Sequence, residues 1–81
     1  MSASSVSPVG LIGRVSRHGE IRPGRTGEVL VEIRGGMESF LARDVDGKEI
    51  AADEEVVVVE QVAARTVLVS RLYDTPPSEE K

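Results

Sequence analysis

The pattern of apolar and polar residues along the chain predicts a set of short β-strands. It is clearest at residues 25–34, where Val29, Val31 and Ile33 fall on one face and the other face is polar except at Leu30. A period of two places successive side chains on opposite faces of a strand, so we expect this segment to be a half-buried central strand. Gly35 and Gly36 follow it and are expected to form a hairpin turn, because glycine accepts the positive φ that such turns need.

Four other segments complete the predicted set, at residues 9–17, 37–45, 55–62 and 65–72. Short strands separated by glycine-containing turns indicate a sandwich or a barrel, and five strands are few for two sheets. A closed barrel also hides the strand edges. We therefore predict an all-β fold, a small five-stranded barrel of the OB type, with an SH3-like barrel as the alternative.

Length and composition leave room for one domain. We expect a barrel at residues 9–73 between two disordered tails, a small polar one at 1–8 and a charged one with two prolines at 74–81. The chain has no cysteine, which excludes a disulfide and a thiolate site. No apolar run reaches the length of a membrane span, and no signal-peptide pattern is present.

The net charge of −4 is unevenly distributed. Residues 1–36 contain five arginines against three glutamates, whereas residues 37–81 contain five basic and eleven acidic side chains. An acidic balance disfavours general binding to nucleic acid or to anionic lipid, since both carry negative charge.

The sequence contains no recognisable catalytic set. His18 is the only histidine, there is no cysteine, and no serine lies in a G-x-S-x-G context. The acidic run at residues 53–55 is typical of a solvated turn whose charges flank an apolar strand. We therefore expect no enzymatic activity, no cofactor and no metal site.

The segment at residues 55–62 contains four consecutive valines, so both of its faces are apolar. One pair of valines must line the core, and the other must be covered by a loop, exposed to water or buried against a partner. Exposed apolar patches of this kind mark protein contacts. The candidate partner-binding residues are Leu30, Leu41, Val56, Val58 and Leu68, with the alternate pair Val57 and Val59 if that pair faces outward.

The fold class also raises a second function, binding of single-stranded oligonucleotides. OB barrels that do this combine a positive groove with aromatic side chains on which bases stack. The candidate residues for this alternative are Arg14, Arg22, Arg25, Arg34 and Phe40. The competing interpretation is that the arginines are solvated strand and loop residues, and together with the acidic net charge this ranks nucleic-acid binding second.

Several short segments together resemble a known family. They are LIGRV at 11–15, IRPG at 21–24, VLVEIRG at 29–35, FLAR at 40–43, IA at 50–51, VVVVE at 56–60 and VLV at 67–69. Over residues 11–72 this order of strands and turns resembles the soluble C-terminal domain of NfeD-like membrane proteins. One departure is Asp53-Glu54, because family members often have a glycine before the valine-rich strand.

The resemblance implies an OB barrel attached behind transmembrane helices. It also implies association with flotillin-like (SPFH) membrane scaffold proteins. The doubled apolar face and the missing catalytic set, taken with the resemblance, predict docking on such a partner or self-association, with no chemistry of the domain's own. On this basis we expect a protein-interaction module in the cytoplasm, tethered at the inner face of the plasma membrane through a partner or through helices upstream of the domain.

Overall fold

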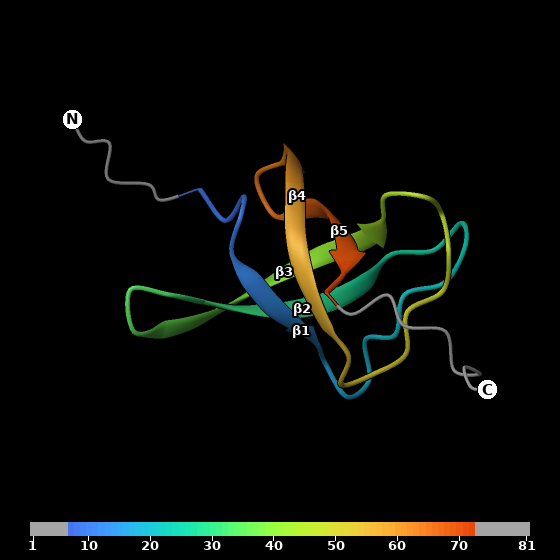
Figure 1. Ribbon diagram of the computed structural model, residues 1–81, viewed down its shortest axis with the longest axis horizontal. Coiled ribbons are helices and arrows are strands. Elements are labelled where there is room, and N and C mark those ends of the chain that lie inside the picture. The colour runs from blue at the N-terminus through green and yellow to red at the C-terminus, as the bar shows by residue number, and fades with distance from the viewer. Residues whose placement is uncertain (1–6, 73–81) are drawn as a thin grey trace.

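The computed structural model describes residues 7–72, which form a closed barrel of five strands (Figure 1). These residues contain no helix, and so none that is long and apolar enough to cross a membrane. The strands are β1 (Ile12–Val15), β2 (Gly27–Ile33), β3 (Gly36–Asp44), β4 (Glu55–Ala63) and β5 (Thr66–Arg71).

The strand order around the barrel is β1-β2-β3-β5-β4, and β4 closes the ring by pairing with β1. All neighbouring strands are antiparallel except β3 and β5, which are parallel. This order is that of the OB-type barrel, which confirms the predicted fold class. The β2–β3 hairpin projects beyond the barrel (Figure 1) because β1 pairs with β2 only at Val29–Val31 and β5 pairs with β3 only from Leu41 onward.

The core is built from branched aliphatic side chains on the inner face of each strand, with one phenylalanine. Since the inner positions alternate with outer ones, a barrel this small is filled by its own side chains. The buried apolar residues are Val15, Ile21, Val29, Val31, Phe40, Ala42, Ile50, Val56, Val58, Val67 and Val69.

The strand pairing decides which valines of β4 face inward. Val56 pairs with Gly13 of β1, and Val58 pairs with Val69 of β5, whose side chain is fully buried. Val56 and Val58 are 0% and 1% exposed. The choice of these two as partner-binding residues was therefore wrong, because directly paired residues share a face of the sheet and this face is the core.

The loop between β1 and β2 is fixed to the barrel by two isoleucines outside the named strands. Ile21 and Ile50 form an isolated antiparallel bridge in which each amide donates to the other residue's carbonyl oxygen at 2.9 Å. Both side chains are buried in the core. This bridge joins the β1–β2 loop to the loop between β3 and β4.

The ends of the predicted elements differ from the observed ones where backbone conformation intervenes. The β2–β3 turn is Arg34-Gly35, one residue before the predicted glycine pair, with φ of 54° and 81°. Positive φ at both central residues is the signature of a type I′ turn. The first strand begins at Ile12 instead of residue 9, since Gly10 has φ of 89° and breaks the extended conformation.

The expected domain boundaries extend beyond what the structure describes. Pro8, assigned to the first tail, is buried, and its carbonyl oxygen accepts a 3.0 Å hydrogen bond from the amide of Leu11. Residues 1–6 of that tail, Tyr73 and the tail at 74–81 lie outside the described residues.

Candidate functional site

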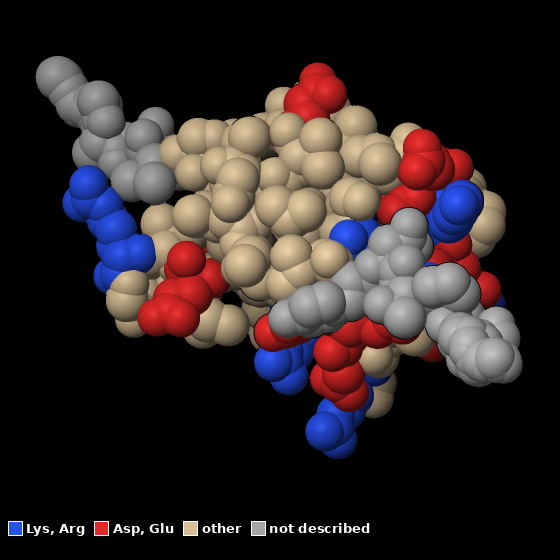
Figure 2. Space-filling model, viewed as in Figure 1, with Lys and Arg blue, Asp and Glu red and all other residues tan. Residues whose placement is uncertain are grey.

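An uncharged surface lies on the outside of the barrel where the start of β1 pairs with β4 (Figure 2), and the Arg14–Glu55 ion pair borders it. Ile12 is 53% exposed and pairs with Val57, which is half-buried beside it. The amide of Gly10 donates to the carbonyl oxygen of Val58 at 2.8 Å, so the segment containing Val9 also runs along β4. We call the outward side chains of Val9, Ile12, Val57 and Val59 the β1–β4 face.

The β1–β4 face is unusual because the outer positions of an antiparallel sheet normally carry polar side chains. Val59 is 46% exposed and Val9 is 45% exposed, although both are β-branched apolar residues. The cause is the run of valines, which makes β4 apolar on both faces while only one face can enter the core. An exposed apolar patch of this kind is typical of a protein contact.

The structure does not bring the predicted partner-binding residues together. Leu68 borders the β1–β4 face, because it pairs with Glu60 next to Val59. Leu30 lies on the outer surface of β2 and pairs with Arg14 of β1, so it is one strand away from the β1–β4 face. Leu41 lies farther away, on the outer surface of β3. The residues predicted from the sequence did not include Ile12 and Val9. Ile12 could have been found, because the alternation of the first strand places it on the face opposite its two neighbours.

The arginines proposed for nucleic-acid binding are dispersed and partly neutralised. Arg14 forms a salt bridge with Glu55 at 3.5 Å, and the Nε of Arg22 donates to Glu20 at 3.1 Å. That hydrogen bond, and then the charge of Glu20, raise the pKa of the Arg22 guanidinium. Arg34 lies in the turn of the projecting β2–β3 hairpin. Of the four candidate arginines, Arg14, Arg22, Arg25 and Arg34, only Arg22 and Arg25 line one common concave surface.

Phe40 is not available for base stacking, which corrects its candidate role. Its side chain is only 5% exposed, and the guanidinium carbon of Arg65 lies 4.7 Å from the ring centroid. Phe40 is also the only Phe, Tyr or Trp within residues 7–72. Because sequence-tolerant strand binding relies on exposed aromatic platforms, the described residues disfavour the oligonucleotide alternative.

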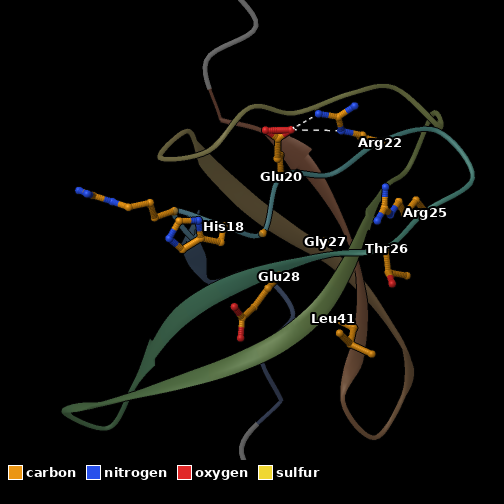
Figure 3. A pocket seen from close by; sticks show the side chains of 10 residues that line it. His18, Glu20, Arg22, Arg25, Thr26, Gly27, Glu28 and Leu41 are labelled. Carbon is orange, nitrogen blue, oxygen red and sulfur yellow. Dashed lines mark hydrogen bonds and ion pairs between the residues drawn. The ribbon is translucent and has the colours of Figure 1, made fainter.

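A shallow basin of about 680 Å³ lies beside the β1–β2 loop (Figure 3). His18 borders it on one side and Arg25 on another, with Leu41 of β3 at its edge. Arg17 also lines it. We call this concave surface the β1–β2 basin. Within residues 7–72, no group of three or more histidine, aspartate and glutamate side chains is placed to hold a metal ion.

The NfeD C-terminal domain family matches residues 12–70, from the first residue of β1 to the last residue but one of β5. The chain belongs to this family. The match includes most of the β1–β4 face and the whole β1–β2 loop, and it confirms the resemblance drawn from the strand and turn pattern.

Two solved structures share the fold of this NfeD C-terminal domain. The soluble domain of the NfeD protein YuaF from Bacillus subtilis is 27% identical with a TM-score of 0.65, over 78% of this chain and 71% of that chain. The C-terminal domain of the stomatin operon partner protein 1510-C from Pyrococcus horikoshii is 33% identical with a TM-score of 0.64, over 83% and 91%. No curated protein matches the chain.

Asp53 precedes β4 at the point where NfeD family members often have a glycine, and it adopts the backbone conformation that glycine favours. Asp53 has φ of 69°, in the left-handed region, and its amide donates to the carbonyl oxygen of Val15 at 2.8 Å. Aspartate tolerates this region better than most side chains. The turn that starts β4 is therefore retained without glycine.

Proposed function

We propose that this NfeD C-terminal domain is a non-catalytic protein-interaction module that docks through the β1–β4 face on a stomatin- or flotillin-like (SPFH) membrane scaffold protein. The observation that carries the proposal is the exposure of Ile12 and Val59 on an uncharged face of a closed barrel. The similarity to the C-terminal domain of a stomatin operon partner protein supports this choice of partner.

In this proposal the domain acts in the cytoplasm at the inner face of the plasma membrane. Its attachment comes from upstream helices, as in NfeD-like membrane proteins, or from the scaffold itself. The face needs no charged groups for this role, because burial of apolar area against the partner supplies the free energy of binding.

The side chains of the β1–β4 face are suited to being the centre of such an interface. Ile12 and Val59 each have about half of their surface in water. Fully burying an aliphatic side chain stabilises a complex by about 1.5–3 kcal/mol, so burying the remaining half of each contributes about 1 kcal/mol. A glutamate at either position would leave a charge without a partner in the interface, which weakens binding further.

The test is the affinity of the full chain for the purified soluble part of an SPFH scaffold protein from the same organism, measured by calorimetry. We expect Val59→Glu and Ile12→Glu to lower the affinity by at least about tenfold, which corresponds to about 1.4 kcal/mol. Both substitutions leave the core intact, since the side chains face outward, and circular dichroism should show an unchanged fold.

The matched control is Met37→Glu. Met37 is also apolar and is 63% exposed, but it lies on the projecting β2–β3 hairpin away from the β1–β4 face. We expect this variant to bind like the original chain. Full affinity in both Ile12→Glu and Val59→Glu would contradict the proposed docking face.

A further inference from the structure

We propose that the β1–β2 basin binds an acidic peptide segment of the protein partner. This inference rests on the proposed function and names a second part of the contact. It goes beyond the β1–β4 face because it is carried by charge and by a concave surface on another side of the barrel, next to β2 and β3.

Two of the arginines that line the basin have no ion-pair partner in the described part of the chain. Among residues 7–72, neither Arg17 nor Arg25 takes part in a salt bridge, whereas Arg14, Arg22, Arg65 and Arg71 each pair with a glutamate. Figure 3 shows His18 and Arg25 on different sides of the basin. A guanidinium group can bind a carboxylate through two parallel hydrogen bonds, so these arginines fit an acidic ligand.

The two carboxylates that line the basin are already engaged. Glu20 accepts hydrogen bonds from the guanidinium of Arg22, and Glu28 accepts a 3.0 Å hydrogen bond from the hydroxyl of Ser16. Arg22 balances the charge of Glu20, but the hydroxyl of Ser16 is neutral, so Glu28 keeps its charge. Three arginines against two glutamates give the lining one net positive charge. The basin is thus locally positive on a chain with a net charge of −4.

The backbone around the basin is held in place before any ligand binds. The amide of Glu28 donates to the carbonyl oxygen of Gly19 at 2.8 Å, which ties the loop to the start of β2. A Cβ added at Gly27 would collide with the Gly19 carbonyl oxygen and lie 2.7 Å from that of Glu20, so the loop packs directly on the strand there. Such preorganisation lowers the entropy lost on binding.

An acidic peptide suits the basin better than a nucleic acid does. Leu41, 49% exposed at the edge of the basin, offers an apolar contact to a peptide side chain, and no exposed Phe, Tyr or Trp lies within residues 7–72 to stack a base. The acidic net charge of the chain also repels a long polyanion more than a short peptide. β5 lies between β3 and β4, so a partner on the β1–β4 face can continue across the barrel to Leu41.

The direct test is a titration of the isotope-labelled full chain with a synthetic peptide of alternating glutamate and leucine at low salt. The uncharged control peptide carries glutamine in place of glutamate. We expect amide shifts at Arg17, Arg25 and Leu41 that weaken as salt is added. Equal binding of the glutamine peptide, or tighter binding of a single-stranded oligonucleotide, would overturn the inference.

The matched variants separate the basin from the proposed docking face. The double substitution Arg17→Glu and Arg25→Glu should lower the affinity for the glutamate peptide at least about tenfold. Arg34→Glu is the control, because Arg34 is also exposed and forms no salt bridge within residues 7–72 but lies in the β2–β3 turn. Unchanged peptide binding in the double variant would refute the basin.

The same variants tell failure of this inference from failure of the proposed function. If the SPFH scaffold binds normally to the double variant and poorly to Val59→Glu, the docking face stands and the basin is refuted as part of the contact. If the scaffold binds poorly to the double variant and normally to both Ile12→Glu and Val59→Glu, the β1–β4 face is refuted. Loss of scaffold binding in both supports the two surfaces together.

Discussion

Replacing Val58 with alanine tests the assignment of the valine run in β4 to core and surface. Val58 is 1% exposed and its neighbour Val59 is 46% exposed. The two residues share the same chemistry, the same strand and the same substitution, so a difference between Val58→Ala and Val59→Ala reports burial alone.

The expected magnitude follows from the groups removed. Valine to alanine removes two methyl groups, worth about 1.6 kcal/mol of transfer free energy at a buried site. The cavity left behind in a tightly packed core adds to this, so we expect Val58→Ala to lower the free energy of unfolding by about 2–2.5 kcal/mol. At Val59 the methyl groups are half in water, and the loss should be about 0.5–0.8 kcal/mol.

These losses are easy to measure in a chain of this size. A domain with 66 described residues has a free energy of unfolding of about 3–10 kcal/mol. One kcal/mol shifts the melting temperature by about 4–8 °C, so Val58→Ala should melt about 8–20 °C lower than the original chain.

The assay is thermal and urea unfolding of the full chain followed by circular dichroism. The urea m-value should stay constant, because neither change alters the surface exposed on unfolding by much. Equal losses at the two sites, or a larger loss at Val59, would refute the core assignment of Val58 and with it the exposure of the β1–β4 face.

Two other substitutions test how the loops are held. Gly27→Ala should destabilise the fold by about 1–3 kcal/mol in urea unfolding, since the added methyl group collides with the carbonyl oxygen of Gly19 and lies 2.7 Å from that of Glu20. Gly36→Ala has its nearest atom at 3.8 Å and should change little, and equal effects would contradict the close packing of the loop. Arg65→Ala should lower the free energy of unfolding by about 1 kcal/mol, because it removes the cation over the ring of Phe40, and an unchanged urea midpoint would argue against this contact.

Most of the fold follows from local patterns in the sequence. The five strands lie where alternation or an apolar run predicted them, and the observed β4 at Glu55–Ala63 differs from the predicted segment by one residue. The misplaced features depend on backbone conformation or on distant partners. The β2–β3 turn includes Arg34, whose positive φ no propensity for arginine would predict.

The candidate site was less predictable because it depends on which side chains meet. Phe40 alternates with Leu41 in the expected way, but only the assembled barrel shows that it lies in the core beneath Arg65. Likewise, the sequence shows arginines and glutamates without their pairing. The salt bridges leave Arg17 and Arg25 unpaired among the described residues and thereby make the β1–β2 basin positive.

The sequence by itself determined that β4 would be apolar on both faces, because four valines in a row occupy both sides of any strand. It could not determine which pair is buried, since the alternation is the same when read from either face. The tertiary structure decided this through register: Gly13 opposite Val56 and Val69 opposite Val58 turn that pair inward. A shift of one residue would exchange the pairs, because the side chains of a strand alternate with a period of two.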